Sequence, residues 1–148
     1  MNNKAIKRAK EIVASATVKN GVFGGEYCSL VLVDIQGYPT ASVLTAAKSE
    51  GISKVWFCTG LESNKVARIK ANNKASVHFG ASEHSITLVG EVGILTDDAT
   101  KKAMWYDGLE YHFEKGYADP NYCVLAFTAK RYNIFVDDFE IEGEVLSL

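Results

Sequence analysis

The stretch from Val55 to Phe79, "VWFCTGLESNKVARIKANNKASVHF", joins two apolar runs through a polar cluster. Its first four residues are apolar and typical of a buried strand, and its last six alternate like a second strand. Between them apolar residues recur at helical spacing. The order predicts a strand, a short helix over residues 63–71 with a left-handed stop at Asn72 and Asn73, and another strand.

The polar cluster lies where the first strand ends and the helix begins. A helix start exposes unpaired N–H groups and the positive end of the helix dipole. With the hydroxyls of Thr59 and Ser63 and the ammonium of Lys65, it would form an anion cradle suited to phosphate. The alternative is that Ser63 only caps the helix and Lys65 is a solvated surface residue. The local pattern alone favours this alternative, because the spacing T-x-x-x-S-x-K is no general motif.

Upstream of this stretch, two β-rich runs flank a turn. The segment "YCSLVLVD" (27–34) passes through "IQGYP" (35–39) into "TASVLTAA" (40–47), which predicts a hairpin. A second turn, "KSEGISK" (48–54), leads into the strand that begins at Val55. Three strands in close succession favour an antiparallel meander over alternating βαβ units. An amphipathic helix over residues 3–15 precedes them.

Downstream, "SITLVGEVGIL" (85–95) reads as a long strand in which Gly90 and Gly93 indicate a bulge or sharp bend. Thr96 is expected to cap a helix that ends near Gly108. Acidic residues in its first turn are expected to pair four residues on with basic ones, namely Asp97 and Asp98 with Lys101 and Lys102.

The chain closes with two more expected strands, "CVLAFTA" (123–129) and "RYNIFVDD" (131–138), and a short acidic tail. Seven strands with few, short helices predict a mainly β fold, a closed or split antiparallel barrel. Nothing repeats and no linker divides the sequence, so we expect a single domain over residues 1–148.

The composition of the chain argues against some classes of function. The 148 residues carry 16 basic and 18 acidic side chains, a net charge of −2, which gives no positive field for nucleic acid. No run approaches the roughly 18 apolar residues of a membrane span, and the charged N-terminus has no apolar signal region. We therefore expect a cytoplasmic protein without nucleic-acid or membrane partners. Its three cysteines, Cys28, Cys58 and Cys123, fit reduced core thiols.

No side chain stands out as a catalyst or metal ligand. The histidines, His78, His84 and His112, lack metal-ligand spacing. Likewise Asp34, Glu83 and Glu91 show no pairing that would nominate a general acid and base. We therefore expect no metal site and leave the catalytic residues unassigned.

The quoted stretch resembles the FMN-binding split-barrel superfamily of pyridoxamine 5'-phosphate oxidase. In that family a strand ending in aromatic-x-Thr leads through Ser-Arg-Lys into a helix ending in "NNP" or similar. The preceding "GYPTASVLTA" and following "SITLVGEV" fall in the same order, so the likeness covers roughly residues 25–95. The nearest branch is that of small bacterial general stress proteins, to which "FEKGYADPNYCVLAFTAKRYNIF" is also similar.

The resemblance implies a set of FMN-binding residues. Residues along the second strand would lie beside the isoalloxazine ring: Ser42, Val43, Leu44 and Thr45. Cys58 and Thr59 would lie beside the ribityl phosphate arm. The phosphate would be held by Ser63, Asn64 and Lys65, and Ser85 occupies the position of a flavin-contacting glutamine. Two positions depart from the family: Asn64 replaces a bidentate arginine, and Ser85 is shorter than glutamine.

The implied function is flavin-dependent oxidoreduction of an unknown small molecule, with FMN carrying the chemistry. Two alternatives stay open: a non-catalytic flavin-binding or stress-response protein, and a haem-binding relative. We expect the chain not to be a true pyridoxamine 5'-phosphate oxidase. After Arg131 it lacks the basic residue and histidine with which those oxidases shape the substrate pocket, and it carries an acidic tail instead.

The resemblance also implies a homodimer with the flavin cleft between subunits. In this view Trp56, Phe57 and Phe79 stay partly uncovered until a second chain packs on them. Trp105 could stack on the flavin of a neighbouring subunit, but its spacing from Ala99 on an amphipathic helix favours a place in the core.

Overall fold

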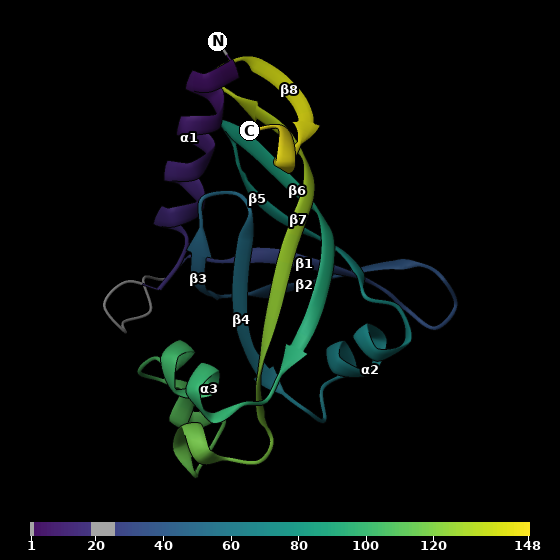
Figure 1. The fold of residues 1–148 in the computed structure, drawn as a ribbon, viewed down its shortest axis with the longest axis vertical. Helices are drawn as coiled ribbons and strands as arrows, with labels where there is room; N and C mark the ends of the chain where they lie inside the picture. Colours follow the sequence, from purple (N-terminus) through teal and green to yellow (C-terminus); the bar gives the residue numbers. More distant parts are fainter. Residues whose placement is uncertain (1, 19–25) are drawn as a thin grey trace.

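One antiparallel sheet, curled into a half-open barrel, forms the body of the protein (Figure 1). The computed structural model describes residues 2–18 and 26–148. Across the sheet the strands run β2-β1-β5-β6-β7-β4-β3, and β8 pairs with β7 off this path. The predicted mainly β split barrel is confirmed, with eight strands where the sequence predicted seven. The strands are β1 (Cys28–Val33), β2 (Pro39–Leu44), β3 (Ala46–Glu50), β4 (Lys54–Gly60), β5 (Lys74–Ala81), β6 (His84–Leu95), β7 (Tyr122–Val136) and β8 (Phe139–Glu144).

Short helices cover the sheet. They are α1 (Asn2–Ser15), α2 (Asn64–Ala71), α3 (Asp98–Met104) and the 3-10 turns η1 (Leu109–Tyr111), η2 (Gly116–Ala118) and η3 (Val145–Ser147). The helices expected over residues 3–15 and 63–71 are confirmed. In Figure 1, α1 lies along one side of the barrel, α2 and α3 near its other end. No helix in the described ranges is long and apolar enough to cross a membrane.

Strand alternation places the core inside the curl of the sheet. Along β1 every second side chain is buried, among them Leu30 and Leu32, while the residues between them face outward. A second, smaller cluster lies beneath α3. The expectation that Trp56, Phe57 and Phe79 need a second chain to cover them is wrong, because they are only 9%, 0% and 2% exposed within one chain. They are buried by α1, α3 and the neighbouring strands, whose placement the sequence does not reveal.

The two edges of the sheet meet at a corner. Strand β2 ends at Leu44 and β3 begins at Ala46, so Thr45 alone joins the two outermost strands of the seven-stranded path. The expected turn over residues 48–54 is in fact shorter, since Lys48 lies on β3 with its ammonium 5.4 Å from the centre of the Trp56 ring. The single strand expected over residues 40–47 is therefore two strands, β2 and β3, and the open seam of the barrel lies between them.

A bulge bends the long β6–β7 pair at Gly90. The register shifts between Val89 and Gly90, as predicted. A Cβ at Gly90 would overlap the carbonyl oxygen of Thr128 and lie 2.9 Å from the Cα of Ala129. By contrast, Gly93 is exposed, stays in register, and would have no neighbour within 4 Å of an added Cβ. Only the first glycine therefore lets two backbones approach.

The C-terminal third differs most from the sequence-based prediction. The two expected last strands are one 15-residue strand, β7, and the expected acidic tail forms β8. The expected break at Lys130 is the extra residue of the β6–β7 bulge, because Ala129 pairs with Gly90 and Arg131 pairs with Val89. The turn comes later, where Asp137 and Asp138 adopt left-handed φ angles of 51° and 66°.

The α3 region also departs from prediction. Asp97, not Thr96, caps the helix, accepting a 3.0 Å hydrogen bond from the Thr100 N–H, and α3 ends at Met104 rather than near Gly108. In the described part of the chain, Asp97 and Asp98 form no ion pair with Lys101 or Lys102. Lys101 is buried instead. Its Nζ donates to the Asp119 carbonyl at 2.9 Å, tying α3 to the loop before β7.

The C-terminal end of α2 also differs from the predicted left-handed one. Asn72 is extended, with φ −154° and ψ 113°, and its N–H donates to the Arg68 carbonyl. Its Oδ1 accepts from the Lys74 N–H at 3.0 Å, so the side chain turns the backbone directly into β5. A left-handed residue is not needed, because the next strand starts at once.

The buried cysteines are expected to make the protein less stable in alkali. Burial raises the pKa of Cys28 to about 12 and that of Cys123 to about 11, above the ordinary range of a thiol. The unfolded chain therefore loses these protons first as pH rises. We expect the free energy of unfolding to fall from about pH 9 to about pH 11, by about 1.4 kcal/mol per thiol per pH unit. Urea unfolding across this range measures the slope; Cys123→Ala should reduce it, and an unchanged slope would contradict the assignment.

Candidate functional site

The start of α2 has the serine cap that the sequence indicates. Ser63 caps the helix with φ −65° and ψ 147°, and its Oγ accepts a 3.1 Å hydrogen bond from the Lys65 N–H. Asn121, which the sequence analysis missed, holds the preceding loop. Its carbonyl accepts from the Leu61 N–H at 2.6 Å, and its Oδ1 from the Glu62 N–H at 3.2 Å. The loop between β4 and α2 is thereby fixed to the start of β7.

The donors of this cluster suit a phosphate. The Ser63 hydroxyl accepts from the backbone, so its own proton remains free to donate. Among the described residues, the half-buried Lys65 forms no ion pair and the half-buried Thr59 side chain no hydrogen bond. Asn64 is exposed at the first helical position. An ammonium, two hydroxyls and a helix N-terminus together fit a phosphate anion.

The residues from Ser42 to Leu44 do not share one face. Val43 pairs with Ser29 across β1 and is 65% exposed on the outer face of the sheet. Ser42 pairs with the buried Leu30, and Leu44 packs against the main core, so both lie on the inner side. Only Val43 of this group is available to a ligand on the outer face.

Ser85 lies on the same outer face as Val43. Strand register runs from Val43 through Ser29 to His78, and His78 Nε2 lies 2.8 Å from Ser85 Oγ. These residues line one shallow hollow of about 420 Å³, together with His84 at the start of β6. The predicted pair Val43 and Ser85 is therefore brought together, with a histidine between them that the sequence analysis left aside.

Thr45 and Cys58 meet at the second cluster, under α3. The Tyr106 hydroxyl hydrogen-bonds with the Thr45 side chain, and burial raises the pKa of Tyr106 to about 12. Cys58 Sγ lies 3.3 Å from the Met104 carbonyl and 3.5 Å from the Tyr122 hydroxyl. Burial raises the pKa of the Cys58 thiol to about 11, so it stays protonated near neutral pH and is no thiolate nucleophile.

Cys58 and Thr59 are neighbours on β4 but have different surroundings. Cys58 packs in the second cluster, whereas Thr59 pairs with Cys123 of the main core. Trp105 packs in the second cluster with its ring 5.3 Å from that of Tyr122, edge to face, in keeping with the favoured core assignment.

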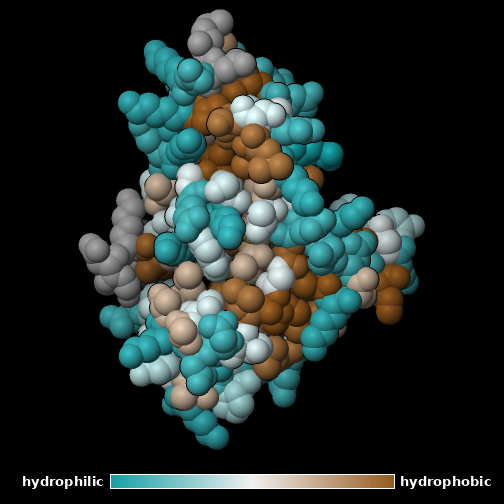
Figure 2. Space-filling view, in the orientation of Figure 1, coloured by the Kyte–Doolittle hydropathy of each residue, from teal (hydrophilic) through white to brown (hydrophobic). Residues whose placement is uncertain are grey.

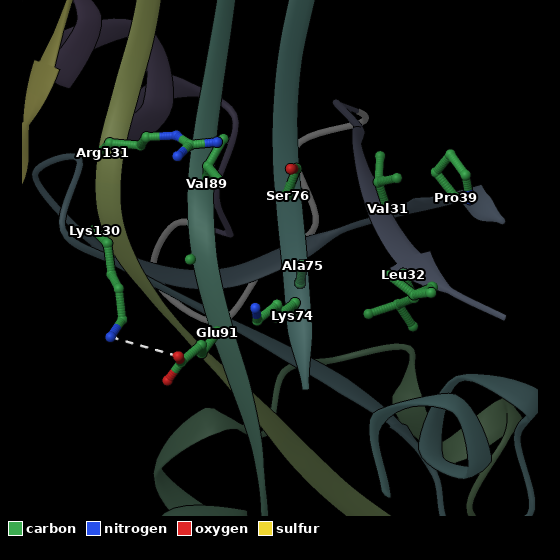
Figure 3. A pocket seen from close by; sticks show the side chains of 12 residues that line it. Val31, Leu32, Pro39, Lys74, Ala75, Ser76, Val89, Glu91, Lys130 and Arg131 are labelled. Carbon is green, nitrogen blue, oxygen red and sulfur yellow. Dashed lines mark ion pairs between the residues drawn. The ribbon is translucent and has the colours of Figure 1, made fainter. Parts of the chain in front are cut away.

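A further hollow continues the outer face along β1, β5, β6 and β7 (Figure 3). Its volume is about 430 Å³, and its centre is lined by apolar side chains that include Val31, Pro39 and Val89. Charged residues border it, with Lys130 and Glu91 in a 3.4 Å ion pair. Figure 2 shows hydrophobic side chains gathered on this side of the molecule and again at the tip of the β1–β2 hairpin, where Ile35 is 94% exposed.

Comparison with known proteins identifies relatives of this fold. A family model described as "Pyridoxamine 5'-phosphate oxidase like" matches residues 14–136. No curated protein matches the chain. Among solved structures, one similar protein comes from Clostridium acetobutylicum and is described as related to general stress protein 26, in the pyridoxinephosphate oxidase family. It is 28% identical over 99% of both chains, with a TM-score of 0.83.

More distant structures share the fold. General stress protein 26 from Bacillus anthracis is 18% identical over 97% of this chain and 98% of its own, with a TM-score of 0.73. A heme binding protein from Mycobacterium smegmatis is 16% identical over 95% of this chain and 57% of its own, with a TM-score of 0.71.

Proposed function

Because the chain belongs to the pyridoxamine 5'-phosphate oxidase-like family, we propose that it binds FMN and acts as a flavin-dependent oxidoreductase on a small molecule. The observation that carries the proposal is the cluster at the start of α2. Lys65 is half-buried without an ion pair in the described residues, in the first turn of the helix that Ser63 caps, and the half-buried Thr59 lies near the end of the preceding strand. Such a set of donors is suited to the FMN phosphate.

In this proposal Thr59, Ser63 and Lys65 hold the phosphate, and the exposed Asn64 adds an amide donor at its rim. Val43 and Ser85 face the flavin ring from the outer face of the sheet. Thr45 and Cys58 have a supporting role: Thr45 hydrogen-bonds with Tyr106 at the corner between β2 and β3, and Cys58 contacts the Met104 carbonyl at the end of α3. Inward-facing Ser42 and Leu44 contribute through their backbone. Bound FMN would supply the electron or hydride chemistry, while these residues bind and orient it.

The visible absorption spectrum of the purified protein tests the proposal. We expect the bands of oxidised flavin, and tighter binding of FMN than of riboflavin, which lacks the phosphate. Loss of the flavin bands on adding NADH or NADPH, and their return with an electron acceptor, would support an enzyme. Bound but inert flavin would support a non-catalytic binder. A haem spectrum would contradict the FMN proposal; a heme binding protein is among the similar folds.

We further propose a homodimer that covers the apolar centre of the outer face. Val31, Val33 and Val89 are only half-buried there, and they line the hollow seen in Figure 3. We expect sedimentation to give a dimer at micromolar concentration, because exposed apolar patches of this kind mark association surfaces. Val89→Lys should shift the protein to a monomer, whereas Ala67→Lys, exposed on α2, should not. A wild-type monomer with FMN bound would remove this proposal.

We expect no efficient turnover of pyridoxamine 5'-phosphate. The acidic segment after Arg131 is strand β8, and its Glu140 lies in register with Phe135, which pairs with Ser85. Glu140 is thus two strands from the ring-facing Ser85, about 10 Å across the sheet. That carboxylate disfavours a doubly charged phosphate nearby. Following pyridoxal 5'-phosphate and peroxide under oxygen measures the activity, and saturable turnover at micromolar substrate would overturn the expectation.

A further inference from the structure

The imidazole of His78 lies along β5 on the outer face of the sheet. His78 pairs with Thr87 of β6, whereas the next outward residue of β5, Gly80, pairs with Ser85. His78 Nε2 nevertheless lies 2.8 Å from Ser85 Oγ. The ring reaches that hydroxyl by leaning along its own strand, over Gly80. The contact is therefore a diagonal one across the β5–β6 pair.

Gly80 leaves room for this diagonal contact. A Cβ added there would lie 2.5 Å from His78 Cε1 and 3.3 Å from both ring nitrogens. A side chain at this position would therefore occupy the space of the imidazole, and the ring, as the end of a side chain, would swing away. With glycine in place, the ring stays over the strand, in the hollow of about 420 Å³ that His78 and Ser85 line together with Val43.

The direction of the hydrogen bond between His78 and Ser85 follows from which ring nitrogen has a partner. Among residues 2–18 and 26–148, the Ser85 hydroxyl is the one hydrogen-bond partner of the His78 side chain, and Nδ1 has none. When a ligand covers the hollow and excludes water, a proton on Nδ1 would lack an acceptor, whereas a proton on Nε2 has Ser85 Oγ. The proton is therefore assigned to Nε2. Ser85 then accepts from the imidazole, and its own proton remains free to donate to a ligand.

The flavin ring of the proposed cofactor has acceptor atoms along its edge, namely carbonyl oxygens and ring nitrogens. We propose that His78 is a positioning residue, which donates from Nε2 to Ser85 and so directs the Ser85 hydroxyl proton toward such an acceptor. This inference rests on the proposed function, in which Ser85 faces the flavin ring. No carboxylate or ammonium of the described residues lines the hollow, so the imidazole sets the direction of this hydroxyl. Because reduction makes the acceptor atoms of the ring more negative, a donor placed there favours reduced flavin.

Two substitutions of His78 test this role. His78→Leu removes the donor, and we expect it to weaken FMN binding about fivefold and to lower the reduction potential of the bound flavin. His78→Gln keeps an N–H group that can reach Ser85, and should restore both values to near those of the wild type. The control is Thr87→Val, which removes a half-buried outward hydroxyl that forms no hydrogen bond within the described residues, and it should change neither value. Fluorescence titration measures the affinity, and equilibration with a reference dye measures the potential.

Gly80→Ala tests the geometry while both side chains of the pair are present. The new Cβ should push the imidazole away from Ser85 and weaken FMN binding at least as much as His78→Leu does. Adding His78→Leu to Gly80→Ala should then weaken binding no further, because the contact is already broken. A further loss in the double variant would overturn the inference. Urea unfolding of each variant shows that it is folded under the conditions of the titration.

Two other results would overturn the inference while the proposed function stands. One is wild-type affinity and potential in His78→Leu. The other is a His78→Gln protein as impaired as His78→Leu, since the packing of the ring and not its hydrogen bond would then matter. If the wild-type protein binds no FMN, the proposed function itself fails, and the inference fails with it.

Discussion

Replacing Gly90 with alanine is expected to lower the free energy of unfolding by about 3 kcal/mol. The new Cβ would overlap the Thr128 carbonyl oxygen and lie 2.9 Å from the Ala129 Cα. Both are backbone atoms of a central strand, so neither can move aside as the end of a flexible side chain would. Strands β6 and β7 would have to separate at their bulge, in the most extensively paired part of the sheet.

Urea unfolding of the variant measures this loss. The matched control is Gly93→Ala on the same strand, where an added Cβ meets no atom within 4 Å. Its stability should change by no more than about 0.5 kcal/mol. Similar losses in both variants would show that glycine matters in β6 for some reason other than backbone approach.

Replacing Lys65 with methionine is expected to weaken FMN binding more than tenfold. A charge-assisted hydrogen bond to phosphate contributes about 1.5–3 kcal/mol, and methionine keeps the apolar stem while removing the charge. Fluorescence quenching of FMN on titration with protein measures the affinity. Ser63→Ala is a poorer test, because it also removes the helix cap.

The control is Lys7→Met, which removes one positive charge from the exposed face of α1. Lys48 is unsuitable despite its apparent position in a turn, because its ammonium lies over the Trp56 ring. Equal affinity losses in Lys65→Met and Lys7→Met would mean that Lys65 is a solvated surface residue and that only net charge affects binding.

The fold was predictable where the signal is local. Alternation along β1, the turn after it and the serine cap of α2 all depend on neighbouring residues, and the structure has them as predicted. The errors concern features that depend on contacts between residues far apart in sequence. Lys130 looks like a break between two strands, yet it is the extra residue of a bulge, and β7 continues through it with Ala129 and Arg131 both paired with β6. Lys101 looks solvated, but the loop at Asp119 buries it.

Sequence-based prediction of the candidate site has the same limit. The family resemblance placed Ser42 to Thr45 together beside the flavin ring, but strand alternation separates Val43 from Ser42 and Leu44. Sequence reasoning dismissed His78 for lack of metal-ligand spacing, although the β5–β6 register places its ring against Ser85. Asn121 gave no signal at all, because the loop it holds is far away in sequence. Pairing of distant strands, which residue patterns do not encode, decides which polar groups face one another.

The position of β7 in the sheet has a consequence for the order in which the chain folds. Strand β4 pairs with β7, with Lys54 opposite Thr128, although the β5–β6 hairpin and the α3 region lie between them in sequence. During synthesis, β1, β2, β5 and β6 can pair as soon as they emerge, whereas β3 and β4 must wait as an isolated hairpin. Joining these two halves costs loop entropy before their contacts form, so we expect β7 to close the barrel in a late and slow step. Until then the free edges of β4 and β6 are open to chaperones or to the same edges of other nascent chains.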